Sequence, residues 1–226
     1  MNHILDNPAW NALISGNKHL AKGNNQIRYF DKEVSPFVAF EENSMENFEL
    51  LYEQITHAEP LVFVTSDKTE IPDAWKVLYL ISGLQMVYDV PTTITDTDSS
   101  IVSLTNEHIP QMLSLTKLTN PGPFAERTIE FGHYKGIFDG DKLVAMAGQR
   151  MHAFEYAEIS AVCTHPDYTG RGYAKLLLLQ QINRIKAAAG IPFLHVRDDN
   201  ERAIKVYESL GFAARKPIYF YVIQKN

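Results

Sequence analysis

The stretch THPDYTGRGYAKLLLLQQ, residues 164–181, joins a loop with two glycines to the start of an apolar helix. A helix N-terminus usually has a capping Ser, Thr, Asp or Asn and acidic neighbours, because its free N–H groups and positive dipole end need an acceptor. Here Thr169 can cap, but the first helical turn carries no acid. Gly170 and Gly172 let backbone N–H groups approach a ligand closely. The stretch therefore predicts an anion as the missing acceptor.

Two common phosphate-binding patterns do not match this loop. A Walker loop needs Lys-Ser or Lys-Thr after its last glycine, and none follows Gly172. A dinucleotide loop needs a further small residue where Lys175 stands, and the nearest later acid, Asp198, is too distant. The remaining candidate ligand is a pyrophosphate bound by backbone amides. The alternative is that the two glycines only form a tight turn.

Composition limits the class of protein. The chain has 226 residues, of which 45% are hydrophobic, enough for one large folded domain or two smaller ones. Its net charge of −6 argues against a broad nucleic-acid surface. No apolar run approaches the roughly 20 residues of a membrane span, and the start of the chain does not resemble a signal peptide. With a single cysteine, the sequence predicts a cytoplasmic protein without nucleic-acid or membrane partners.

A polar segment, residues 91–100, predicts a linker that divides the chain into residues 1–95 and 96–226. The first part is predicted to be a small α/β region without a catalytic constellation. Its expected elements are a helix that starts with Pro8 after Asn7, a strand at 36–42, a helix capped by Ser44 and a strand at 60–66.

The second part alternates strands and helices more clearly. Asp139-Gly140 between two apolar runs predicts a hairpin. The other strands are expected at 100–104, 157–165, 191–196 and 217–223, and the helices at 105–118, 121–132, 173–189, where Gly190 ends the helix, and 200–212, with Asn200 as cap and Gly211 as terminator. This order predicts an α/β (α+β) fold, a mixed, mostly antiparallel sheet flanked by helices.

The run EISAVCTHPDYTGRGYAKLLL, residues 158–178, followed by NERAIKVYESLGF, residues 200–212, resembles the acetyl-CoA-binding half of the GNAT superfamily of N-acetyltransferases. The family's loop starts with Arg or Gln, where this chain has Thr169. The phrases LDNPAWNAL, PGPFAERT and EISAVCTHP also resemble a bacterial branch related to glycine N-acyltransferases. The resemblance implies a GNAT-like fold and acetyl-CoA as acyl donor.

The same resemblance implies roles for individual residues. The pantetheine arm would pair with the backbone of Val162, Cys163 and Thr164, and Asn200 would contact the cofactor. Tyr207 would protonate the leaving thiolate. The pyrophosphate would lie on Gly170, Arg171, Gly172, Tyr173, Ala174 and Lys175. Without the resemblance, Asn200 reads as an ordinary helix cap and Tyr207 as a core aromatic residue.

An amine with a pKa near 10 is mostly protonated at neutral pH, so direct attack on a thioester needs a base. Glu158 occupies the position of the glutamate base in one branch of the superfamily, and His195 that of a glutamate in another. We rank Glu158 first, because residues 158, 160, 162 and 164 share one face of a strand except where a bulge shifts them, so that Glu158 can face the cleft. The alternatives are a solvated Glu158 and a half-buried structural His195. His133, His152 and His165 lack a metal spacing, so no metal is expected.

These features predict an N-acetyltransferase that transfers an acetyl group from acetyl-CoA to a small-molecule or peptide amine in a ternary complex. Residues 1–95 and the segment TNPGPFAERT, residues 119–128, are expected to shape the acceptor pocket. Residues 1–95 are predicted to be a degenerate or partial copy of the same fold. A non-catalytic acyl-CoA-binding sensor or interaction module is the alternative, and a homodimer is left open.

Overall fold

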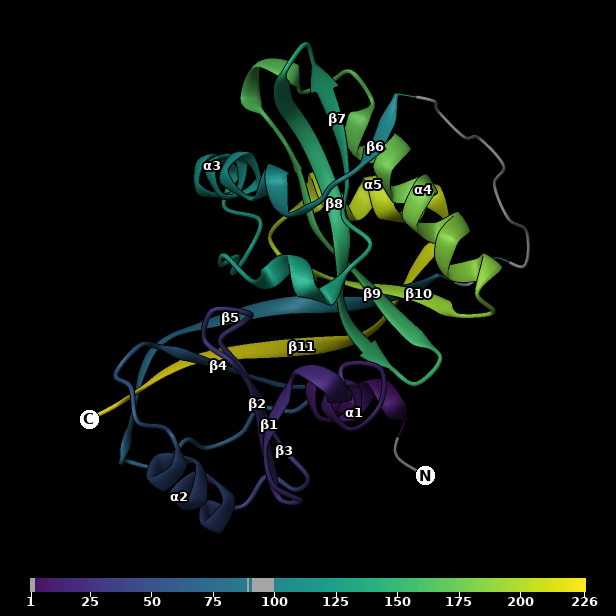
Figure 1. Cartoon of the computed structure of the whole chain (residues 1–226). Helices are drawn as coiled ribbons and strands as arrows, with labels where there is room; N and C mark the ends of the chain where they lie inside the picture. The colour runs from purple at the N-terminus through teal and green to yellow at the C-terminus, as the bar shows by residue number, and fades with distance from the viewer. Residues whose placement is uncertain (1–2, 89, 91–99) are drawn as a thin grey trace.

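Eleven strands form one continuous sheet in the order β1-β2-β3-β4-β11-β5-β10-β9-β8-β7-β6 in the computed structural model, which describes residues 3–88, 90 and 100–226 (Figure 1). The strands are β1 (Ala21–Gly23), β2 (Ile27–Phe30), β3 (Phe37–Phe40), β4 (Leu61–Thr65), β5 (Trp75–Tyr88), β6 (Ile101–Ser103), β7 (Lys135–Asp139), β8 (Lys142–Ala153), β9 (Tyr156–Thr164), β10 (Ile191–Arg197) and β11 (Phe212–Lys225). The pairs β3–β4 and β9–β10 are parallel, and the others are antiparallel. This confirms the predicted mixed, mostly antiparallel sheet.

The sheet has helices on both faces. The α-helices are α1 (Pro8–Ile14), α2 (Met45–Gln54), α3 (Ile109–Thr119), α4 (Tyr173–Ala187) and α5 (Glu201–Leu210), and the 3-10 helices are η1 (Ile4–Asp6), η2 (Lys18–Leu20), η3 (Asn106–His108), η4 (Thr128–Phe131) and η5 (Pro166–Tyr168). One apolar cluster packs α4 and α5 against the sheet through side chains such as Leu178, Ile182 and Leu210. Another includes Leu13 of α1 and Met112 of α3.

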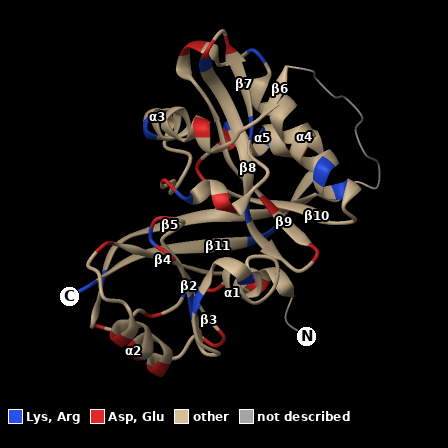
Figure 2. Ribbon diagram, in the orientation of Figure 1, with Lys and Arg blue, Asp and Glu red and all other residues tan. Residues whose placement is uncertain are grey.

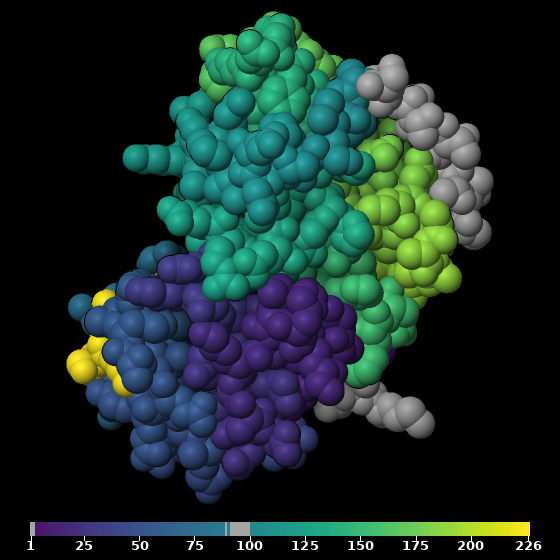
Figure 3. Space-filling model, in the orientation of Figure 1, coloured from purple at the N-terminus to yellow at the C-terminus, as the bar shows by residue number. Residues whose placement is uncertain are grey.

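The two parts of the chain repeat one motif and exchange their last strands. In each, an antiparallel pair leads into a parallel strand–helix–strand unit, β3-α2-β4 in the first part and β9-α4-β10 in the second. The strand after β4, β5, pairs with β10, whereas the last strand, β11, pairs with β4. β5 and β11 also pair with each other over most of their length. Figure 3 shows the consequence, since the yellow C-terminal residues emerge among the blue N-terminal part.

Most predicted elements form, and several predicted caps are confirmed. Ser44 accepts a hydrogen bond from the Asn47 N–H, and Asn200 accepts one from the Ala203 N–H. Gly211 ends α5 with a left-handed backbone, φ 103°. The hairpin forms as well, with Asp139 opposite Lys142. The predicted linker at 91–100 lies, apart from Ser100, outside the described residues.

Three local expectations are wrong. Thr169 does not cap α4, because its hydroxyl donates to the Pro166 carbonyl and the helix begins after Gly172. Gly190 does not provide the left-handed residue after α4, which is Ala189 at φ 57°. The helix expected at 121–132 is reduced to the 3-10 helix Thr128–Phe131, and the long central strand β5 was not predicted.

Candidate active site

Strands β9 and β10 separate along their length. They pair in parallel only from Tyr156–Glu158 to Ile191–Phe193. Beyond Glu158, β9 contains a bulge, because Cys163 and Ser160 lie opposite Met146 and Gly148, which are one residue closer together along β8. Ala161 in this bulge has a left-handed backbone, φ 52°. Past Glu158, the edge of β9 that faces β10 is therefore free of strand pairing, and backbone groups there can bind an extended ligand.

The bulge moves side chains between the faces of the sheet. Ile159 packs with the α4 and α5 cluster, and Val162 packs there as well. Ala161 and Cys163 belong to the cluster that includes α1 and α3. Residues 159 and 161 would share a face in a regular strand, so the bulge reverses the alternation.

The loop before α4 leaves the helix N-terminus open. Gly170 and Gly172 both have φ 82°, and an added Cβ at either would meet nothing within 4 Å. Gly172 is the N-cap, no side chain caps the helix, and its first turn contains no acid. The free N–H groups and dipole of a 15-residue helix thus face open space, which is a ready anion site. This is the geometry that the predicted pyrophosphate site, residues 170–175, requires.

Charged and aromatic side chains border this loop. The Tyr168 hydroxyl donates to Asp139 Oδ2 at 2.6 Å, which ties the loop to the β7–β8 hairpin. The Arg171 guanidinium lies 4.6 Å from the Tyr168 ring centroid, and the Lys142 ammonium lies 5.4 Å from it. Thr164, at the end of β9, has a buried hydroxyl oxygen without a hydrogen-bond partner among the described residues. An orphaned hydroxyl, an uncapped helix and nearby cations together suit a phosphorylated ligand such as coenzyme A.

Two predicted site residues stand at α5, with Asn200 as its N-cap and Tyr207 within the helix. Asn200 caps the helix at 3.1 Å from the Ala203 nitrogen, so its side-chain oxygen is already used. Tyr207 packs edge-on against Phe212, with ring centroids 6.1 Å apart. Burial raises the pKa of Tyr207 to about 12, so its hydroxyl keeps its proton at neutral pH. Their contacts with a cofactor stay predictions.

Glu158 is fully buried and paired with two basic side chains. Arg150 donates from Nε and Nη2 to its two carboxylate oxygens, at 2.9 and 2.5 Å, and the His195 Nδ1 lies 2.7 Å from Oε1. Burial alone would raise the pKa of Glu158, but Arg150 and His195 outweigh it and lower the pKa well below its usual range. The alternative of a solvated Glu158 is therefore wrong, and Glu158 is ionised and held by Arg150 and His195.

His195 continues this network toward the N-terminal part. Gln85 Nε2 donates to the Leu5 carbonyl at 2.9 Å and lies 3.1 Å from His195 Nε2, while Gln85 Oε1 accepts from Arg215 at 2.7 Å. Because these partners fix the amide orientation of Gln85, its NH₂ donates to His195 Nε2 and the imidazole proton sits on Nδ1. Sequence reasoning missed Gln85, since a lone glutamine in an apolar strand gives no signal.

A small pocket adjoins the bulge of β9. Its lining combines Arg150, Tyr134, Ser160 and Ala161 with the segment Pro121–Phe124 and Thr128. The space open to the centre of a water-sized atom is about 10 Å³, which suffices for about one water molecule. The predicted acceptor segment, residues 119–128, thus borders the bulge of β9. Tyr134 was not singled out from the sequence, because a tyrosine at a strand start resembles an ordinary core residue.

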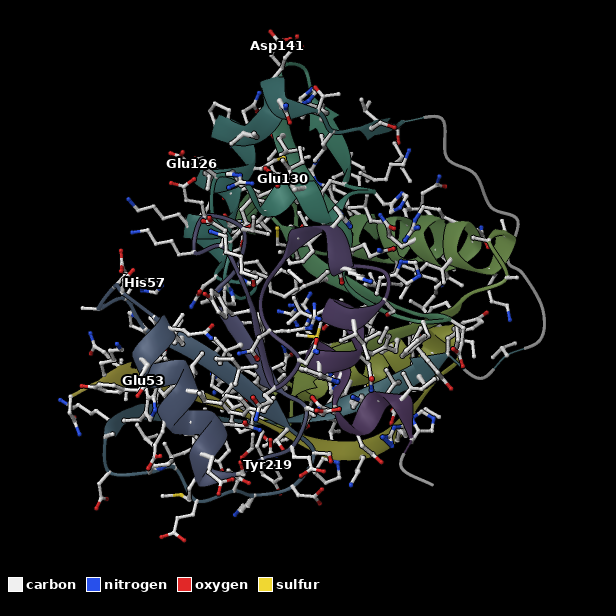
Figure 4. The ribbon with its side chains drawn as sticks, turned by 60° about the horizontal axis from the view of Figure 1, so that its bottom comes forward. Glu53, His57, Glu126, Glu130, Asp141 and Tyr219 are labelled. Carbon is white, nitrogen blue, oxygen red and sulfur yellow. The ribbon has the colours of Figure 1, made fainter. Side chains whose placement is uncertain are left out.

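A larger groove lies elsewhere, between loops of the two parts. Its volume is about 520 Å³, and its lining includes His57, Glu59, Leu113 and Glu126. Figure 4 labels His57 and Glu126, which come from the N-terminal and C-terminal parts, and Asp141, which projects at the tip of the β7–β8 hairpin. The groove lining does not include the β9 bulge or the α4 loop, so we place the chemistry at the smaller pocket.

The burial of Cys163 argues against nucleophilic catalysis by its thiol. Cys163 is buried, and burial raises its pKa to about 11, so its thiolate population at neutral pH is small. Among the described residues, no cluster of three His, Cys, Asp or Glu could hold a metal ion. No helix in the described part of the chain is long and apolar enough to cross a membrane. Lys and Arg are interspersed with Asp and Glu over the elements in view (Figure 2).

Comparison with known proteins agrees with this geometry. Residues 134–221 match the family described as FR47-like protein. The chain is 38% identical over 84 residues to the N-alpha-acetyltransferase RimI of Mycobacterium tuberculosis, a match that covers 35% of this chain and 51% of that protein. It is 31% identical over 121 residues to the [ribosomal protein bS18]-alanine N-acetyltransferase of Salmonella typhimurium, covering 50% of this chain and 78% of that one. The chain thus spans about half the length of the first relative.

A solved structure extends the likeness to the whole chain. The crystal structure of a GNAT-family protein from Novosphingobium aromaticivorans superposes with a TM-score of 0.93, at 33% identity and over 100% of both chains. The chain therefore shares both sequence and fold with this relative. The shared region includes the separated β9 and β10, the bulge and the uncapped α4. The chain belongs to the GNAT family of acetyltransferases.

Proposed function

We propose that this protein is an N-acetyltransferase that transfers an acetyl group from acetyl-CoA to a primary amine by direct attack in a ternary complex. The observation that carries the proposal is the joint geometry of β9 and α4. The free edge of β9 after Glu158 and the open N-terminus of α4 lie at the two ends of one loop, residues 165–172. A ligand with an extended amide arm and a pyrophosphate matches both features.

Individual roles follow from this placement. Backbone groups of Val162, Cys163 and Thr164 would bind the pantetheine arm and position the thioester at the bulge. The N–H groups at residues 170–175 would hold the pyrophosphate, helped by Arg171 and Lys175. Thr169 replaces the family's long polar side chain, and Arg171, placed on the Tyr168 ring, supplies a nearby positive charge. When bound, acetyl-CoA supplies the activated acetyl group.

Proton transfer would involve the remaining predicted residues. Tyr207 keeps its proton and can give it to the leaving sulfur. We propose that Glu158 and His195 act as a pair in taking up the amine proton. The lowered pKa of Glu158 makes it a weak base alone, but its carboxylate would stabilise an imidazolium at His195, 2.7 Å away. For His195 Nε2 to accept a proton, the Gln85 amide has to turn away.

The first part of the chain would complete the fold and border the acceptor site. Its repeated motif, β3-α2-β4, supports the hypothesis that residues 1–95 are a degenerate copy of residues 96–226. The N-terminal and C-terminal parts would share one active site, because β5 of the first supports His195 of the second through Gln85. A relation to glycine N-acyltransferases and a cytoplasmic location remain our proposals.

The test is amine-dependent release of coenzyme A thiol from acetyl-CoA, measured over a panel of primary amines with the wild type and Tyr207→Phe. We expect the variant to bind acetyl-CoA with an unchanged Kd in calorimetry, and its kcat to fall by about 100-fold, the scale of general acid catalysis. Tight binding without thiol release for any amine would instead support a non-catalytic acyl-CoA sensor. An absence of binding would refute the cofactor site.

A further inference from the structure

The hydroxyl of Tyr134 lies in the small pocket without a partner. The side chain is 3% exposed, and no hydrogen bond to its hydroxyl occurs within the part of the chain that the structure describes. The ring is held on two sides. It makes an edge contact with Phe124, with centroids 5.7 Å apart, and it lies over Gly148, where an added Cβ would come within 2.4 Å of the ring. An immobilised hydroxyl on a pocket wall, without a partner among the described residues, can donate a hydrogen bond to a ligand.

The neighbours of this hydroxyl are mostly hydrogen-bond donors. Arg150 uses Nε and Nη2 for Glu158, and within the described residues Nη1 has no acceptor. Ser160 also lines the pocket, and its hydroxyl has no described partner. Burial raises the pKa of Tyr134, so its hydroxyl stays protonated and can donate. The carboxylate that Arg150 contacts, Glu158, is already paired with Arg150 and His195.

The size of the pocket limits what can enter. The space open to the centre of a water-sized atom is about 10 Å³, so one small polar group can reach the donors. Donors around such a volume select an atom with lone pairs. Because the guanidinium charge of Arg150 is balanced by Glu158, the pocket does not require an anion, and a neutral hydroxyl or carbonyl oxygen suffices.

We propose that Tyr134 contacts the acceptor and donates a hydrogen bond to an oxygen atom of the acceptor. The inference rests on the proposed acetyl transfer and narrows its acceptor class to oxygen-bearing amines rather than plain alkylamines. Arg150 and Ser160 form the rest of this oxygen subsite, and Gly148 is the position that leaves room for the Tyr134 ring.

The test compares two acceptors of equal size, ethanolamine and propylamine, which differ by an oxygen in place of a methyl group. We expect the wild type to prefer ethanolamine in kcat/KM. Tyr134→Phe, which removes only the hydroxyl, should reduce kcat/KM for ethanolamine by about 10- to 100-fold and leave that for propylamine within about twofold. Tyr79→Phe, at an exposed tyrosine on β5, is the matched control and should change neither.

Equal losses for both amines, or no loss for either, would overturn the proposal. A lower thermal stability of Tyr134→Phe with unchanged discrimination would assign the hydroxyl a structural role and would also overturn it. A wild type that binds acetyl-CoA but acetylates neither amine would refute the proposed function instead. In that case the oxygen subsite is tested by calorimetric binding of ethanolamine and propylamine to the wild type and to Tyr134→Phe. Equal affinities of the two amines for the wild type would reject the subsite.

Discussion

The open N-terminus of α4 makes a quantitative prediction for Gly172. An added Cβ meets nothing within 4 Å, so a side chain here costs mainly the left-handed backbone at φ 82°, about 1–2 kcal/mol. Gly172→Glu and Gly172→Gln share that cost and have the same size. They differ in one negative charge beside the proposed pyrophosphate site.

The difference between the two variants can be worked out from Coulomb's law. A unit charge pair at about 4 to 6 Å with an effective dielectric constant near 20 interacts by about 3 to 4 kcal/mol. We therefore expect the Kd for acetyl-CoA to be about 100- to 1,000-fold weaker for Gly172→Glu than for Gly172→Gln. The difference should shrink as salt is raised.

The assay is isothermal titration calorimetry of acetyl-CoA with both variants, after urea unfolding has shown that their stabilities match. Equal affinities of Gly172→Glu and Gly172→Gln would refute the placement of the pyrophosphate at α4. Weak binding by both variants at every salt concentration would assign the loss to the backbone at Gly172 rather than to charge.

Three further outcomes follow from the network and the sheet. Glu158→Gln should lower the free energy of unfolding by about 3–5 kcal/mol in urea titration, because it leaves Arg150 buried without a counter-charge. Glu59→Gln, at an exposed ion pair, is the control and should leave the free energy of unfolding nearly unchanged. Since the folded-state pKa of Glu158 is lowered, its ionised form stabilises the fold above the unfolded pKa of about 4.3, and this stabilisation is lost as the pH falls below that value. The unfolding free energy of Glu158→Gln should therefore depend less on pH below about 4.3 than that of the wild type. Parallel pH profiles of the two proteins would contradict the ion pair. Residues 96–226 expressed alone should not give a soluble folded monomer, because β10 and β11 lose β5 between them; a cooperative unfolding transition of that fragment would refute this.

Local signals in the sequence predicted much of this fold. Ser44, Asn200 and Gly211 stand at helix ends where their side chains or backbone are needed, and the turn after Asp139 joins strands adjacent in the chain. Such features depend on residues within a few positions of one another. The exchange of β5 and β11 could not be predicted this way, since it depends on pairing between residues about 130 positions apart.

Part of the candidate site could likewise be predicted from local sequence, and part could not. Gly170 and Gly172 belong to one contiguous loop, and two glycines before a helix predict backbone N–H groups that are open to an anion. The burial of Glu158 between Arg150 and His195 joins β8, β9 and β10, so the state of its carboxylate depends on tertiary packing. Tyr134 is distinguished only by an unpaired hydroxyl beside a bulge, which no spacing in the sequence reports.

The exchange of β5 and β11 also affects how the chain folds while it is being synthesised. A ribosome releases β5 long before β10 and β11, the two strands that flank it, have been made. Until β10 and β11 emerge, the nascent chain has an apolar strand of 14 residues with open edges, which favours aggregation. Because β11 is completed only at Lys225, neither part can close its share of the sheet before that residue is made. Chaperone dependence and slow refolding are the expected cellular cost of a sheet whose centre combines strands from both parts of the chain.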